Sequence, residues 1–85
     1  MAKKMSPREL RQVKIDKILP NRRLIFDEYV IMALCHDIRH HGMREPILIE
    51  KYGFDFLILD GEKRWRACKK IGMTRIQAEI IFSAD

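Results

Sequence analysis

The sequence predicts a single α+β domain in which one sheet and two helices form two packed layers. Three observations support this fold class. The chain has 85 residues, helix-type and strand-type hydrophobic patterns alternate along it, and glycine or proline separates the segments. A chain of this length is too short to be divided into two domains that each bury a core. The expected order is strand, helix, strand, strand, helix, strand.

The first eleven residues are expected to form a basic tail with a short helical turn, and the domain is expected to span 12–85. Ser6–Glu9 has the serine cap, first-turn proline and third-position glutamate of a helix start. Val13 and Ile15 then alternate with polar residues, which predicts a brief, half-buried strand.

The first helix is predicted over Asp27–His41. Its apolar residues recur at three- and four-residue spacing, the period of one buried helix face. Asp27 is the expected N-terminal cap and Gly42 the expected stop. The apolar residues of this face are Val30, Ile31, Leu34, Cys35 and Ile38.

A hairpin, a second helix and a last strand are predicted next. The runs 46–51 and 54–59 are rich in β-branched and aromatic residues and are joined by a tight connection, so we expect two largely buried strands. The second helix should begin at Gly61 and end at Gly72. The final strand is expected over 76–82. The residues of the second helix expected to face the core are Trp65, Ala67, Cys68 and Ile71.

Composition and charge indicate a folded, cytoplasmic protein with no membrane partner. The net charge of +5 favours phosphate-bearing partners, either nucleic acid or a nucleotide, although the same residues can serve only solubility. No apolar stretch approaches the roughly 20 residues that span a bilayer, and the chain start lacks the apolar run of a signal peptide. Cys35 and Cys68 are far apart in the sequence and belong to no zinc-type or redox-type pair.

The start of the second predicted helix is the main candidate site. A strand that ends at Asp60–Gly61 and runs directly into a helix leaves unpaired N–H groups and the positive end of the helix dipole available to an anion. Lys63, Arg64 and Arg66 add positive charge, and we expect Arg64 to make the main phosphate contact. Glu62 could assist metal binding or act in proton transfer. The alternative is that these side chains only solvate an amphipathic helix.

A resemblance to a known family follows from these residues. Gly61–Ala67 reads GEKRWRA and resembles the GERRxRA box of ParB-type chromosome and plasmid partition proteins. The resemblance extends to Val13–Asn21, Phe26–Glu28 and His41–Ile49 and covers about residues 12–82. The chain is therefore similar to the N-terminal, ParB-like nuclease domain of the ParB/sulfiredoxin superfamily.

The resemblance implies a nucleotide site for CTP or another nucleoside triphosphate with Mg²⁺. It assigns the triphosphate to the second helix start and the base to the segment before the second strand, and Arg23 resembles the arginine that the family places ahead of its first helix. The residues implied on the phosphate side are Gly61, Glu62, Lys63, Arg64 and Arg66. Those implied on the base side are Gly42, Met43, Arg44, Glu45 and Pro46.

The sequence departs from the family pattern at three points, the first of which is a loop after the Pro20–Asn21 turn that is shorter than usual. Glu45 stands where glutamine is commoner, and the chain ends at Asp85, before the third nucleotide and metal motif and the helix-turn-helix domain of partition proteins. We therefore expect a nucleotide-binding module linked to DNA partition or to regulation of a plasmid, phage or chromosome, as a homodimer or with a partner protein, rather than a complete clamp-forming protein.

Two alternative functions remain open. The first is an enzyme of this fold, either a nuclease or a phosphotransferase, with Glu62 as the general base. Weak triphosphatase activity is compatible with the nucleotide-binding module itself. Sulfiredoxin activity is not expected, because Glu62 occupies the position at which that enzyme has its cysteine. The second is a nucleic-acid-binding module that uses no nucleotide. His36 and His40 lie one helical turn apart, and with Asp37 after the first histidine they resemble a zinc-protease HExxH motif with Asp for Glu. No third ligand is evident, and we expect no metal there.

Overall fold

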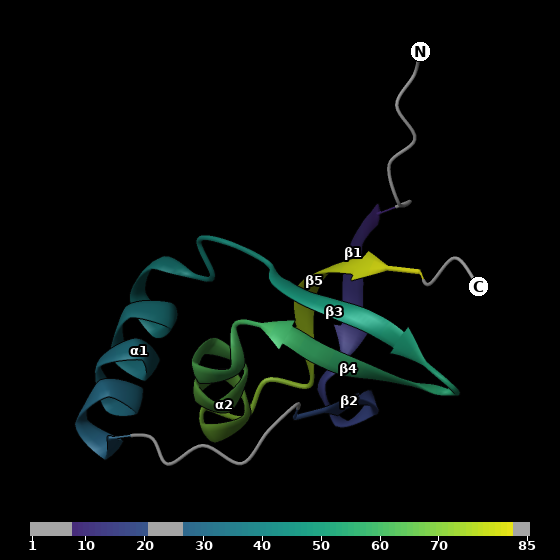
Figure 1. Ribbon diagram of the computed structural model, residues 1–85. Coiled ribbons are helices and arrows are strands. Elements are labelled where there is room, and N and C mark those ends of the chain that lie inside the picture. Colours follow the sequence, from purple (N-terminus) through teal and green to yellow (C-terminus); the bar gives the residue numbers. More distant parts are fainter. Residues whose placement is uncertain (1–7, 21–26, 83–85) are drawn as a thin grey trace.

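The fold is α+β, as the sequence predicts, with two helices packed on one mixed sheet (Figure 1). The computed structural model describes residues 8–20 and 27–82. Within these ranges the elements are, in order, β1 (Arg8–Lys14), the 3-10 turn η1 (Ile15–Lys17), β2 (Ile18–Leu19), α1 (Glu28–His41), β3 (Ile47–Tyr52), β4 (Asp55–Asp60), α2 (Glu62–Lys70) and β5 (Arg75–Ile81). The predicted order is confirmed, with β2 as an additional short strand.

The sheet has the strand order β1-β5-β3-β4-β2. β1 and β5 are antiparallel, as are β3 and β4, whereas β3 runs parallel to β5 and β2 runs parallel to β4. α1 packs mainly on α2, and α2 lies closer to the strands (Figure 1). The helices therefore form one layer and the sheet forms the other, as expected for an α+β domain of this size.

The core lies between these layers and is built mainly from isoleucine. In β5 the buried residues alternate with half-exposed ones, which shows that one face of the strand meets the helices. Isoleucine suits this position because its branched side chain packs well on a pleated surface. The largest fully buried side chains are Ile47, Ile49, Ile58, Ile76, Ile80 and Cys68.

α1 forms where the capping signals predict it. The Asp27 carboxylate accepts a hydrogen bond of 2.9 Å from the Tyr29 backbone N–H, and the Gly42 N–H donates to the Ile38 carbonyl at 2.8 Å. Gly42 has φ 74°, a conformation that favours glycine at a helix end. Of the face predicted to be buried, Val30 is an exception, because it is 40% exposed.

The expectation of a helical turn in the first eleven residues is wrong for the part that the structure describes. Arg8 and Glu9 lie in β1, where Arg8 is paired with Ile81 of β5. The backbone hydrogen bonds of a seven-residue ladder outweigh a local capping signal, which satisfies only a few N–H groups. Ser6 and Pro7 lie outside the described residues. The sheet therefore includes residues 8–11, which the sequence had assigned to the tail.

The hairpin is present, but its tip is more exposed than expected. Tyr52 lies opposite Asp55 where β3 meets β4. Ile47 and Ile49 have no exposed surface, whereas Tyr52 is 61% exposed and Phe54, in the turn, is 92% exposed. The expectation of two largely buried strands therefore holds for the first half of β3 and not for the tip.

α2 presents the face that the sequence predicts to the core. Trp65, Ala67 and Cys68 are buried and Ile71 is partly buried. The Trp65 indole N–H donates to the carbonyl of Ile15 at 3.4 Å, which connects α2 to the turn after β1. Neither α1 nor α2 combines the length and apolarity that a membrane-spanning helix requires, and no other described segment is a candidate.

Candidate functional site

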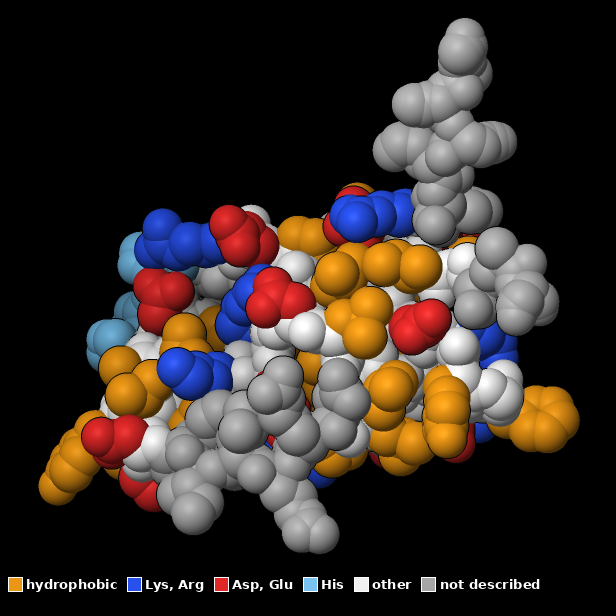
Figure 2. Space-filling model, in the orientation of Figure 1, with side chains coloured by type: hydrophobic (Ala, Val, Ile, Leu, Met, Phe, Trp, Pro, Cys, Tyr) orange, Lys and Arg blue, Asp and Glu red, His pale blue; other side chains and the backbone are white. Residues whose placement is uncertain are grey.

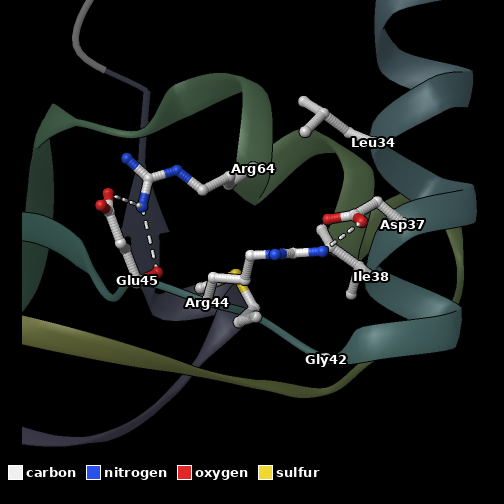
Figure 3. A pocket seen from close by; sticks show the side chains of 8 residues that line it. Leu34, Asp37, Ile38, Gly42, Arg44, Glu45 and Arg64 are labelled. Atoms are coloured by element: carbon white, nitrogen blue, oxygen red, sulfur yellow. Dashed lines mark hydrogen bonds and ion pairs between the residues drawn. The ribbon is translucent and has the colours of Figure 1, made fainter.

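A cavity of about 230 Å³ lies where the end of α1, the segment after it and the start of α2 meet (Figure 3). Figure 3 shows Arg64 turned toward Glu45, and Arg44 turned toward Asp37 on α1. In the space-filling view, basic and acidic side chains lie next to each other over the helices, and apolar side chains gather over the strands (Figure 2). The lining residues are Leu34, Asp37, Ile38, Gly42, Met43, Arg44, Glu45 and Arg64.

Arg64 joins α2 to the segment before β3. Its Nη1 donates hydrogen bonds of 3.0 Å to the backbone carbonyls of Glu45 and of Pro46, and its side chain is 23% exposed. Its Nη2 lies 3.7 Å from the Asp60 carboxylate. A guanidinium can make these contacts together because its donors are fixed in a planar fork. Arg64 therefore holds the wall of the cavity in place, and a phosphate would have to bind through its remaining donors.

Gly61 is required by the packing of the backbone as well as by its conformation. It precedes α2 with φ 102°, in the left-handed region. A Cβ atom at this position would lie 2.7 Å from Ile47 Cγ2 and 3.3 Å from Arg64 Nη2. The structure gives a second reason for glycine here, because the missing side chain makes room for β3. α2 consequently begins without a side-chain cap. The close approach of a phosphate to Gly61 stays a prediction.

Glu62 and Arg66 form an ion pair away from the cavity. Arg66 Nη2 lies 3.1 Å from Glu62 Oε2, and the Glu62 side chain is only 9% exposed. Two residues along an α-helix are separated by about 200° around its axis, so Glu62 and Arg64 point in opposite directions. Lys63 is exposed on α2. None of Glu62, Lys63 and Arg66 lines the cavity.

The structure thus brings together part of the predicted site. Gly42, Met43, Arg44, Glu45 and Arg64 line one cavity, although they come from two separate segments. Pro46 is linked to them through its carbonyl, which Arg64 binds. Arg23 lies outside the described residues.

Three lining residues were not predicted to belong to the site. Leu34 and Ile38 had been assigned to the core, and Asp37 to an incomplete zinc motif. They lie three and four residues apart on α1, on the face that meets the following segment. Arg44 Nη2 lies 3.1 Å from Asp37 Oδ1 with both side chains exposed, so this ion pair contributes little to stability.

The histidines of α1 form no metal site in the part of the chain that is described. The rings of His36 and His40 lie 4.2 Å apart, and His40 Nδ1 is 2.9 Å from the His36 carbonyl oxygen. Within residues 8–20 and 27–82, no group of three or more potential ligands is close enough to hold a metal ion. At the carboxyl end of a helix, a protonated imidazole also interacts favourably with the helix dipole.

The two cysteines are buried, Cys35 in α1 and Cys68 in α2. Cys35 Sγ lies 3.6 Å from the carbonyl oxygen of Ala67, and both thiols are free and buried. Burial, together with the nearby Cys35, raises the pKa of Cys68 to about 11, and Arg64 opposes part of this shift. Cys68 is therefore a protonated thiol at neutral pH and not a nucleophile.

We expect the folded chain to resist alkylation at both cysteines. At pH 8, iodoacetamide should label them slowly in buffer and fast in urea, because only unfolding exposes the thiols.

The stability that the protonated Cys68 contributes is complete below pH 9. It should be lost between pH 9 and about 11, where the unfolded thiol ionises and the folded one does not. In urea titrations, Cys68→Ala should therefore lose less stability than the parent over this range. Equal labelling by iodoacetamide with and without urea would contradict the prediction that the folded chain protects both cysteines.

The comparison with known sequences covers nearly the whole chain. The model of the ParB N-terminal domain family matches residues 1–84. The nucleoid occlusion protein of Geobacillus kaustophilus (strain HTA426) is 42% identical over 94% of this chain and 30% of its own length. That of Oceanobacillus iheyensis is 39% identical over 91% of this chain and 29% of its own length. The chain thus spans less than a third of these relatives.

Solved structures share the fold. The C-terminally truncated partition protein ParB of Caulobacter crescentus, in complex with CTP-γ-S, has a TM-score of 0.80 and 25% identity, over 91% of this chain and 46% of that one. Sulfiredoxin of Arabidopsis thaliana also has a TM-score of 0.80, with 22% identity over 88% of this chain and 86% of that one, which shows the fold alone. A free serine kinase in complex with AMP has a TM-score of 0.74 and 26% identity over 93% of this chain and 32% of that one. The length of the sequence match and the shared architecture establish that this chain belongs to the ParB N-terminal domain family.

Proposed function

We propose that this chain is a nucleotide-binding module that holds CTP or a similar nucleoside triphosphate at the cavity between α1 and α2. One observation carries the proposal: Arg64 binds the carbonyls of Glu45 and Pro46, which places the start of α2 against the segment 42–46. These are the two segments that the family resemblance assigns to a nucleotide. The structure of Caulobacter ParB with CTP-γ-S supports the same ligand class.

The size of the cavity suggests which part of such a ligand it encloses. A volume of about 230 Å³ is smaller than the 300–1,000 Å³ typical of pockets that enclose a whole small molecule. The lining beside α1 is largely apolar, with Leu34, Ile38 and Met43. We infer that the base occupies this space, and that the phosphates extend to the uncapped start of α2, where backbone N–H groups and Lys63 are available.

The charge of the lining supports a role for Mg²⁺. Arg44 and Arg64 are matched by Asp37 and Glu45, so the lining has no net charge that would balance a triphosphate. Mg²⁺ usually binds through one or two carboxylates together with phosphate oxygens and water. Asp37 or Glu45 would hold the ion, which would neutralise part of the phosphate charge.

The wider role that we propose is DNA partition or nucleoid occlusion in the cytoplasm, on a chromosome, plasmid or phage. The relatives named nucleoid occlusion proteins support it, as does a Caulobacter ParB structure complexed to the centromeric parS site. Because the nucleoid occlusion proteins are more than three times as long as the matched region, DNA recognition is proposed for a longer assembly and not for this domain alone.

Isothermal titration with CTP, ATP, GTP and UTP, each with Mg²⁺, tests the nucleotide proposal. We expect CTP to bind selectively and Arg44→Ala to weaken it about tenfold, the effect of one lost charge-assisted hydrogen bond. Lys63→Ala should weaken it similarly. Lys51→Ala is the matched control. Lys51 lies near the far end of β3, so this substitution removes the same charge at a position away from the site.

The outcomes separate the three functional classes. Absence of binding by every nucleotide at millimolar concentration would overturn the proposal. Salt-dependent DNA binding that no nucleotide changes would instead indicate the nucleic-acid-binding alternative. Steady turnover that Glu62→Gln abolishes would indicate an enzyme. The burial of Glu62 and its ion pair with Arg66 favour the binding module over the enzyme.

A further inference from the structure

β1 forms one edge of the sheet. In the order β1-β5-β3-β4-β2 it has β5 as its neighbour on one side, and no other described strand pairs with it on the other (Figure 1). A free edge presents a row of backbone N–H and C=O groups that can pair with a further strand. With seven residues, β1 is long enough to form such a pair.

The backbone groups on this free edge can be identified from the ladder. The N–H of Ile15 donates to the carbonyl of Thr74 at 2.9 Å, which continues the β1–β5 register by one residue. Residues of an antiparallel pair alternate between bonding to the partner and facing away, and the register of Arg8–Lys14 has no shift. Alternate residues counted back from Ile15 therefore bond to β5, and those between them face outward. The outward-facing residues are Arg8, Leu10, Gln12 and Lys14.

The side chains around the middle of this edge are exposed, and two opposite charges flank a central leucine. Leu10 is 57% exposed, so its side chain is available for contact with a partner. It is flanked by Glu9 and Arg11, whose carboxylate and guanidinium lie 2.6 Å apart with both side chains about half exposed. The sequence Glu-Leu-Arg thus carries opposite charges at equal distances from a central apolar residue.

We propose that β1 pairs antiparallel with β1 of a second copy of this chain, with the two-fold axis at Leu10. Leu10 then lies opposite the partner's Leu10, and each Glu9 lies opposite the partner's Arg11. Opposite charges across an antiparallel pair stabilise it, as does contact between apolar side chains. The five-stranded sheets of the two copies join into one continuous sheet.

The charges select this register over its neighbours. Sliding one strand by a single residue would place outward-facing backbone groups opposite inward-facing ones, so the ladder could not form. Sliding it by two residues would place either Glu9 opposite the partner's Glu9 or Arg11 opposite the partner's Arg11. Like charges directly opposite each other are destabilising. A second copy of the chain fits this edge because its charge pattern is self-complementary.

Cysteine cross-linking tests the register directly. Across the proposed axis the two Leu10 Cα atoms would be about 5.5 Å apart, within the range that a disulfide spans. The two Gln12 positions would be offset by four residues, or about 13 Å along the strands. We expect Leu10→Cys to form a disulfide-linked dimer under mild oxidation and Gln12→Cys to remain monomeric on a non-reducing gel. The native cysteines are buried and give the same background in both. Equal cross-linking of both variants would overturn the proposal.

A charge exchange provides an independent test that needs neither oxidation nor nucleotide. Arg11→Glu places two glutamates opposite each other on both sides of the axis. Sedimentation equilibrium should then show dimerisation weaker by an order of magnitude or more. Adding Glu9→Arg to the same chain restores opposite charges and should restore the dimer. A parent chain that stays monomeric at millimolar concentration, or a dimer that neither substitution affects, would contradict the proposed pairing.

Discussion

Replacing Gly61 by alanine is expected to lower the free energy of unfolding by about 2–5 kcal/mol, the sum of left-handed backbone strain and local overpacking. The new Cβ would lie 2.7 Å from Ile47 Cγ2, and Ile47 is fully buried between the sheet and the helices. Neither atom can move aside without disturbing the core. Urea unfolding of parent and variant measures the difference. The same change should displace the start of α2 and weaken nucleotide binding.

Gly72→Ala is the matched control for this prediction. Gly72 also has a positive φ, of 87°, but a Cβ there would meet no atom within 4 Å. This variant should therefore lose only the backbone term, about 1–2 kcal/mol. If the two alanine variants are destabilised equally, the contact with Ile47 has no energetic weight, and the account of Gly61 as a packing residue is wrong.

Local signals in the sequence are enough to predict the helices. Asp27 and Gly42 mark the ends of α1 through hydrogen bonds to residues no more than four positions away, so the sequence pattern contains the whole cause. The β1 strand is different, because its partner β5 lies about seventy positions later in the chain. A capping motif at residues 6–9 competes with a ladder whose stabilisation cannot be seen locally, and the ladder prevails.

The candidate site shows the same division between local and long-range causes. The motif at the start of α2 identified Arg64, and the family resemblance identified the segment 42–46, but not the hydrogen bonds that join them. Those bonds connect positions eighteen and nineteen residues apart, and they depend on how β3 and β4 pair. The helical repeat alone is enough to predict that Glu62 and Arg64 point to different sides of α2, since positions two residues apart differ by about 200° around the helix axis.

Arg64→Ala is expected to reduce both stability and nucleotide affinity, because one side chain holds the cavity wall and faces the proposed ligand. Loss of its two hydrogen bonds to backbone carbonyls should cost about 1–3 kcal/mol in urea unfolding, since Glu45 is exposed and water can replace part of the interaction. The contact with Asp60, at 3.7 Å and largely exposed, should add little. Without this bridge, the segment 42–46 is free to move away from α2, so the affinity for CTP should fall more than it does in Arg44→Ala.

Arg64→Lys separates the two roles of this residue. Lysine keeps the positive charge but lacks the planar fork that bonds two carbonyls at once. We expect the variant to lose most of the stability that Arg64→Ala loses, while it retains part of the nucleotide affinity through charge. Lys63→Ala should show the reverse, with unchanged unfolding and weaker binding, because Lys63 is exposed. If Arg64→Ala unfolds at the same urea concentration as the parent, the carbonyl contacts do not hold the site together, and Arg64 acts on the ligand alone.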